Sequence, residues 1–171
     1  MRAGLVWVWF ASFLLLMTAV PAAAAPPEIA VSAGQHNILD GGDGGELGVE
    51  LRGAPYRLTF LPPFVPGLIP VAGVMMTSKS LAYGYAGLRA DLLLGGRWVL
   101  TPGFAAGLYR QGDGADLGGP VEFRSSIELA YRLGAASCLG LGFYHLSNAG
   151  LYSLNPGSES LILSWTVGLG R

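Results

Sequence analysis

The sequence predicts an all-β fold, an eight-stranded antiparallel up-and-down β-barrel that crosses an outer membrane with its strands. The chain is 51% hydrophobic and only 12% charged, which is apolar for a soluble protein. Its first residues are typical of an exported protein. After residue 24 no stretch of about 18 uncharged apolar residues follows, so we expect no transmembrane helix. An exported, apolar chain without a membrane helix favours a barrel, because only helices and closed barrels satisfy their backbone inside a bilayer.

The first 24 residues are predicted to be a cleaved signal peptide. Arg2 supplies a short positive region, and residues 5–20 (LVWVWFASFLLLMTAV) are almost wholly apolar. Small residues at 21–25 then suit signal peptidase. We place the cut after Ala24, because a cut after Ala25 would leave Pro26 as the first residue. An uncleaved membrane anchor is the alternative, but the apolar run is short and ends in small residues. Residues 25–171 are then read as a single barrel domain.

Strict alternation marks the segment 120–133 (PVEFRSSIELAYRL) as a membrane-spanning strand. One parity is mostly apolar: Val121, Phe123, Ser125, Ile127, Leu129, Tyr131 and Leu133. The other carries four charges: Glu122, Arg124, Glu128 and Arg132. A strand of a soluble sandwich or lipocalin would have to bury these charges in its core, which is costly unless all are paired. We therefore expect the apolar face in lipid and the charged face in a polar lumen, paired across strands.

Seven further strands can be counted. With the segment above, we expect strands at 28–35, 46–60, 68–77, 80–91, 96–109, 120–133, 137–148 and 158–168. Pro55 breaks the alternation of the second strand and suggests a bulge or bend. Glycine- and proline-rich connections separate the strands. An even number of strands puts both chain ends on the periplasmic side.

The residues with chemical potential lie in the last hairpin. His145 and Ser147 are two residues apart on one strand, so their side chains share a face. If the hairpin closes symmetrically about Tyr152, His145 pairs with Glu159 on the next strand. Cβ atoms of directly opposed residues lie about 4.5–5.5 Å apart. A carboxylate there could orient His145 to take a proton from Ser147, which is the arrangement of an activated serine nucleophile.

This group of three continues an apolar stripe. His145 and Ser147 share parity with Leu139, Leu141 and Phe143, and Glu159 shares parity with Leu161. The predicted topology puts them at the extracellular rim, on the lipid-facing side. The candidate walls of an apolar groove beside them are Phe143, Leu151 and Leu161, with Leu146 as a further candidate whose parity points inward. The alternative is that the three polar residues are ordinary interfacial residues of the barrel rim.

Three stretches, 117–131 (LGGPVEFRSSIELAY), 143–150 (FYHLSNAG) and 155–160 (NPGSES), resemble the lipid A 3-O-deacylase family (PagL, acyloxyacyl hydrolases). The resemblance is strongest over residues 71–163. It implies an eight-stranded outer-membrane barrel that hydrolyses the ester-linked acyl chain at the 3 position of lipid A without a metal. By matching motif positions it implies Ser147 as nucleophile, His145 as general base and Glu159 as orienting carboxylate. It further implies that Asn148 and Gly150 serve the oxyanion hole and that Asn155 organises the site.

The sequence therefore favours an exported serine esterase of the bacterial outer membrane, acting on lipid A or lipopolysaccharide in the outer leaflet. We expect no cofactor, no metal and, because no basic stripe is present, no nucleic-acid partner. A non-catalytic small barrel and a barrel esterase or phospholipase with another lipid substrate are the alternatives. The oligomeric state stays open, a homodimer included. His36, in the first long connection, is interpreted as a solvated loop residue.

Overall fold

The computed structural model describes residues 20–21, 26–42, 44–58, 61–62, 64–65 and 67–169. The predicted signal peptide lies outside these residues except for Val20 and Pro21, so its cleavage stays a prediction. In the part of the chain that the structure describes, no helix is long and apolar enough to cross a membrane.

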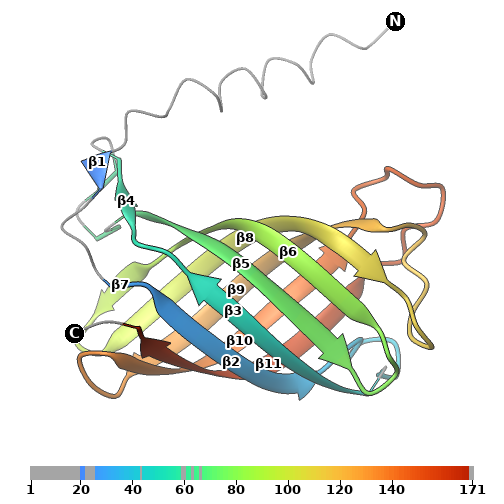
Figure 1. The fold of residues 1–171 in the computed structure, drawn as a ribbon, viewed down its shortest axis with the longest axis horizontal. Coiled ribbons are helices and arrows are strands. Elements are labelled where there is room, and N and C mark those ends of the chain that lie inside the picture. The colour runs from blue at the N-terminus through green and yellow to red at the C-terminus, as the bar shows by residue number, and fades with distance from the viewer. Residues whose placement is uncertain are drawn as a thin grey trace, which may run out of the picture.

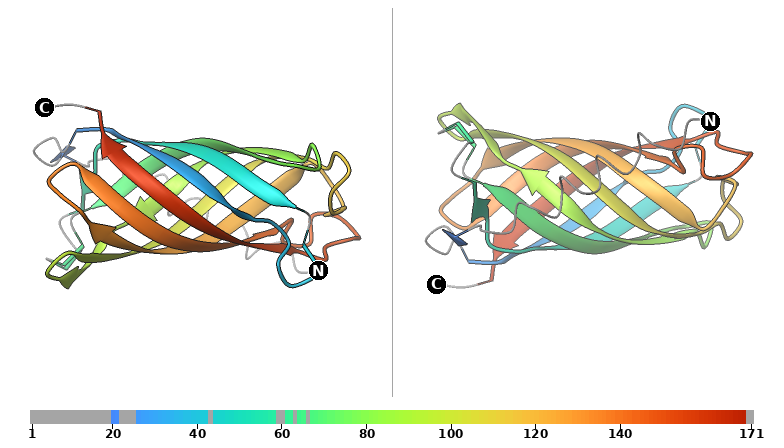
Figure 2. Two further views of the ribbon diagram at one scale, coloured as in Figure 1. Left: turned by 90° about the horizontal axis from the view of Figure 1, so that it is seen from below. Right: turned by 90° about the horizontal axis from the view of Figure 1, so that it is seen from above.

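Eight long antiparallel strands close into a barrel (Figures 1 and 2). They are β2 (Glu28–Gln35), β3 (Gly45–Arg52), β5 (Leu68–Thr77), β6 (Ala82–Ala90), β8 (Trp98–Arg110), β9 (Val121–Arg132), β10 (Ser137–Ser147) and β11 (Ser158–Gly168). Each pairs with the next along the chain, and β11 pairs with β2 to close the sheet. Three short strands lie beside them: β1 (Val20–Pro21), β4 (Tyr56–Arg57) and β7 (Leu92–Gly95). The predicted fold is confirmed.

The second predicted strand, 46–60, is wrong in its latter part. β3 ends at Arg52, and between there and residue 58 only the two residues of β4 form a strand. Residues 59 and 60 of the predicted strand lie outside the described residues. Pro55 lies in the gap and has no N–H to donate to a neighbouring strand. The Gly53 N–H donates to the Pro70 carbonyl at 2.8 Å, and the ladder ends there.

The two faces of the strands differ as alternation predicts. On β9, Ile127 and Leu129 are exposed on the outside of the barrel, whereas Glu122 and Glu128 are buried inside. The same holds on the other strands, where the exposed large side chains are overwhelmingly apolar. The outside is thus suited to hydrocarbon and the inside to polar groups.

A network of charges fills part of the interior. Arg52 donates to Glu50 at 2.8 Å and to Glu128 at 3.2 Å, and Arg89 donates to the same two carboxylates at 3.1 Å each. Arg124 lies 3.5 Å from Glu50. The expected pairing is wrong for Glu122, whose carboxylate oxygens are buried without a hydrogen-bond partner among the described residues. Its register neighbour on β8 is Gly107, which offers no side chain to pair with it.

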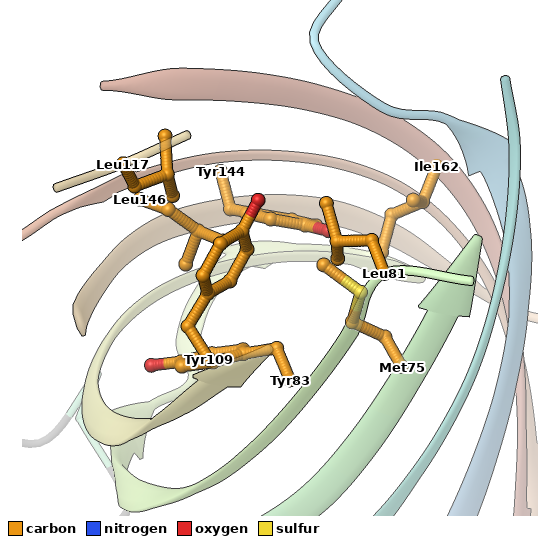
Figure 3. Packing of buried hydrophobic residues seen from close by; sticks show 8 residues of the cluster. All are labelled: Met75, Leu81, Tyr83, Tyr109, Leu117, Tyr144, Leu146 and Ile162. Atoms are coloured by element: carbon orange, nitrogen blue, oxygen red, sulfur yellow. The ribbon is translucent and has the colours of Figure 1, made fainter. Parts of the chain in front are cut away.

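Apolar side chains fill the interior at the other end, where the connections 36–44, 78–81, 111–120 and 148–157 gather (Figure 1). The cluster consists of Met75, Leu81, Tyr83, Tyr109, Leu117, Tyr144, Leu146 and Ile162 (Figure 3). Leu146 is fully buried in it, so the suggestion that Leu146 lines an outer groove is wrong. The last residues of β10 are therefore packed against this cluster on the inner face of the barrel.

The charge network generates a prediction about stability. Arg52 also donates to Thr166 at 2.8 Å, so Arg52→Ala removes the hydrogen bonds to Glu50, Glu128 and Thr166 and leaves two buried carboxylates with one partner fewer each. We expect the free energy of unfolding in urea to fall by about 3–5 kcal/mol. Arg110→Ala, which removes an exposed arginine at the end of β8, should change it by less than about 0.5 kcal/mol. Equal effects of the two changes would show that the network does not stabilise the barrel.

Candidate active site

β10 and β11 bring His145 and Glu159 together. The two residues are direct register partners, and His145 Nδ1 lies 2.8 Å from Glu159 Oε1. The His145 side chain is 40% exposed and the Glu159 side chain 18%. A carboxylate on Nδ1 favours the ring tautomer with its proton on that nitrogen, which leaves Nε2 as the basic nitrogen. The pairing inferred from hairpin symmetry is the one in the structure.

Ser147 is the last residue of β10 and lies on the same face as His145. It is half-buried, and its register neighbour on β9 is Phe123. Among the described residues no hydrogen bond joins the Ser147 hydroxyl to the His145 ring. Two residues along a strand span about 6.5 Å, so the two side chains must lean toward each other to bond.

Asn148 organises the turn that follows Ser147. Its Nδ2 donates to the Leu117 and Leu154 carbonyls, both at 2.7 Å, and its Oδ1 accepts from the Gly150 N–H at 3.0 Å. The Asn148 N–H donates to Asn155 Oδ1 at 3.0 Å. Asn148 is fully buried. These bonds tie the connection 148–157 to itself and to the connection before β9.

The same bonds bear on the oxyanion hole. Both protons of the Asn148 amide are donated to backbone carbonyls, and the Gly150 N–H is donated to Asn148. In this conformation neither group has a free proton for an oxyanion, so their predicted roles there stay predictions. Asn155 accepts the N–H of the residue that follows Ser147, and its predicted role in organising the site stays a prediction.

The predicted groove residues face outward beside this group. Phe143 and Leu161 are register partners one step below the His145–Glu159 pair, and both are exposed. Leu151, in the connection above, is 58% exposed. The pairs Leu141–Leu163 and Leu139–Trp165 continue the apolar surface along the two strands. The candidate site thus borders a continuous apolar face.

No group of three or more His, Cys, Asp or Glu side chains that could hold a metal ion occurs within the described ranges. The chemistry that the described residues offer is that of a hydroxyl, an imidazole and a carboxylate.

The family model described as "Lipid A 3-O-deacylase (PagL)" matches residues 81–167, about half of the chain. The chain belongs to this family. The matched range contains His145, Ser147 and Glu159, and it also contains the asparagines of the connection between them. No curated protein sequence matches the chain significantly.

Solved structures agree on the fold of this family member. The crystal structure of the outer membrane enzyme PagL superposes with a TM-score of 0.69 at 16% identity, covering 83% of this chain and 99% of that one. Neisserial surface protein A gives a TM-score of 0.55 at 15% identity, covering 86% and 99%. A designed barrel, TMB2.3, gives 0.57 at 10% identity, covering 89% and 100%. At these identities the likeness establishes the outer-membrane barrel fold.

Sequence analysis missed one residue near the site, Gly157, and misinterpreted another, His36. Gly157 lies against the His145 ring: a Cβ there would be 2.6 Å from Cε1. His36 is fully buried inside the barrel, so its interpretation as a solvated loop residue is wrong. The inward parity of Ser158 and Ser160 was the one available signal that a polar partner was needed inside. Nothing in the sequence pattern singles out Gly157.

Gly157 generates a prediction. Its φ is +78° and the space beside it is occupied by His145, so Gly157→Ala should displace the ring and break its bond to Glu159. The chain has only two histidines, so the ¹⁵N shifts of the His145 imidazole can be followed by NMR in micelles. Gly95→Ala is the matched control, because Gly95 has a φ of +96° with nothing within 4 Å of the added carbon. Unchanged His145 shifts in Gly157→Ala would refute the contact.

Proposed function

We propose that this protein is an outer-membrane lipid A deacylase that hydrolyses the ester-linked 3-O acyl chain of lipid A by a serine esterase mechanism. The observation that carries the proposal is the 2.8 Å contact between His145 Nδ1 and Glu159 Oε1, with Ser147 on the same face. Membership of the lipid A 3-O-deacylase family supports the choice of substrate.

In the first step, the Ser147 hydroxyl attacks the ester carbonyl carbon while His145 Nε2 takes the hydroxyl proton. Glu159 holds the ring by Nδ1 and stabilises the positive charge that it gains. The Ser147 hydroxyl must come within about 3.2 Å of Nε2, a distance that such pairs often reach only with substrate bound. The tetrahedral intermediate places its negative charge on the former carbonyl oxygen.

In the second step, the intermediate collapses, the sugar oxygen leaves with the proton from His145, and an acyl-serine remains. Water then attacks the acyl-serine with His145 again as base, which releases the fatty acid and restores Ser147. The Gly150 N–H would have to share its bond to Asn148 with the oxyanion. A single oxyanion donor is typically worth about 3–4 kcal/mol.

The outward position of the site suits a membrane-anchored substrate. A site in the lumen would require an acyl chain to leave the bilayer, at a cost of about 0.8 kcal/mol for each methylene. At the lipid-facing rim the ester reaches Ser147 by lateral diffusion, with its chain against Phe143, Leu151 and Leu161. We infer that the protein acts in the outer leaflet of the outer membrane.

The first functional prediction concerns Ser147, His145 and Glu159 as a unit. Ser147→Ala and His145→Ala should each reduce turnover by about 10⁴ or more, and the double change should be little worse, because the two residues act in one step. Glu159→Ala should reduce it less, since it only orients His145. Lipid A from expressing cells, analysed by mass spectrometry, should keep the 3-O acyl chain in the first two variants.

Ser153→Ala is the control for these variants, because Ser153 is an exposed serine of the same connection. Its activity should equal that of the unmodified protein. Fully active Ser147→Ala, or losses that add in the double variant, would refute the assignment. Loss of an acyl chain from phospholipid with lipid A intact would favour another lipid substrate.

The second functional prediction concerns substrate access. Phe143→Arg or Leu161→Arg puts a charge on the apolar face below the site, so hydrolysis of lipid A in bilayers should fall far more than hydrolysis of a short soluble p-nitrophenyl ester. Met76→Arg is the control: Met76 is exposed at the same end of the barrel on β5, across from β10. Equal losses on both substrates would mean that the ester does not arrive from the membrane.

A further inference from the structure

A second cluster of polar side chains lies inside the barrel, directly behind Glu159. Its members are His36, Glu46, Tyr144, Ser158 and Ser160, all at most 3% exposed. His36 Nδ1 lies 2.9 Å from Ser160 Oγ, and Ser158 Oγ lies 3.1 Å from His36 Nε2. Ser160 and Tyr144 both donate to Glu46 Oε2, the former at 3.0 Å. This inner cluster is sealed from the surface, so it does not touch a substrate.

The donors and acceptors of the inner cluster form one consistent chain. Ser160 has a single hydroxyl proton and donates it to Glu46, so its oxygen must accept the Nδ1 proton of His36. In the neutral ring Nε2 then has no proton and accepts from the Ser158 hydroxyl. His36 therefore holds both serines at once, one with each ring nitrogen.

These two serines flank Glu159. Along β11 the side chains alternate, so Ser158 and Ser160 point inward while Glu159 points outward to His145. The connection after β2, which contains His36, also bonds to Glu159 through its backbone: the Ile38 N–H donates to the Glu159 carbonyl at 2.9 Å. The first connection of the barrel thus bonds to three consecutive residues at the start of β11.

The start of β11 is where such support is needed. Ser158 is its first residue, and the ten-residue connection 148–157 precedes it. Strand ends open locally with little free energy unless other contacts hold them. A shift of β11 by a fraction of an ångström here would change the contact between Glu159 and His145.

We propose that His36 is a positioning residue, which acts through Ser158 and Ser160 to hold the Glu159 carboxylate against His145. The inference rests on the proposed function, because it assigns His36 to the support of that same site. His36 touches neither substrate nor reacting atoms, and its effect passes through the backbone of β11.

The experiment compares two serines of one strand. Ser160→Ala removes two bonds within the inner cluster, one to Glu46 and one to His36. Ser164→Ala removes a serine-to-carboxylate bond of 3.1 Å to Glu128, farther from the site. Both serines are buried on the inner face of β11. We expect Ser160→Ala and His36→Ala to reduce kcat about tenfold or more with little change in KM, and Ser164→Ala to leave both nearly unchanged.

A double-variant cycle separates positioning from general stability. If His36 acts only through Glu159, then His36→Ala should cost nothing further once Glu159→Ala is present. His36→Gln, which keeps one donor and one acceptor, should recover part of the activity. Full activity in both His36→Ala and Ser160→Ala, losses that add to that of Glu159→Ala, or an equal loss in Ser164→Ala would each overturn the inference. If His36→Ala does not fold, Ser160→Ala and His36→Gln decide.

A second readout does not need activity. The ¹⁵N shifts of His145 should move in Ser160→Ala toward those of Glu159→Ala and stay unchanged in Ser164→Ala. If the unmodified protein hydrolyses no lipid ester, the proposed function fails, and these shifts still decide whether His36 positions Glu159. If the protein is active and Ser147→Ala is inactive, but the ¹⁵N shifts of His145 are unchanged in His36→Ala and Ser160→Ala, the inference alone fails.

Discussion

The closure of the barrel between β2 and β11 is the constraint on which the rest of this structure depends. In hydrocarbon an open strand edge would leave backbone N–H and C=O groups unsatisfied, at several kcal/mol each. Pairing from Leu161–Gln35 to Gly168–Glu28 removes both edges. It also has a local consequence. His36 follows Gln35 directly, so closing the barrel places a residue from the start of the chain behind the start of β11, 124 positions away from Ser160.

Alternation then divides the last hairpin between two environments. On β10, Tyr144 and Leu146 pack inside while His145 points out, and on β11 Ser160 and Glu159 divide in the same way. Tyr144, Leu146 and Ser160 are buried in the apolar cluster or the inner polar cluster. Because neighbours on one strand share a backbone, rigidity on the inner face limits motion on the outer face. The candidate site is therefore supported by packing that it does not touch.

The features that sequence could predict are those set by short-range regularity. Alternation over residues 120–133 predicts the lipid-facing side, and hairpin symmetry pairs His145 with Glu159. The features that it could not predict depend on how separate connections meet. His36 is buried because its connection folds over the barrel end. One amide proton of Asn148 is already donated, because the Leu117 carbonyl, from another connection, lies 2.7 Å away. Pro55 predicted an irregularity in the second strand. Where β3 ends, at Arg52, depends on its pairing with the neighbouring strand β5, which the sequence alone does not give.

The location of the inner cluster follows from the same division. A polar side chain that supported Glu159 from the outside would have to lie at the membrane boundary, where a charged group costs at most about 1 kcal/mol. It would, however, occupy the surface that we propose for the acyl chain. Inside, the space is closed by Tyr144, Leu146 and Ile162, so polar groups there can bond to one another without competition from lipid. The Glu159 carboxylate, which faces outward, is thus best held by groups inside the barrel that act through the backbone of β11. The alternating serines on either side of Glu159 provide that connection.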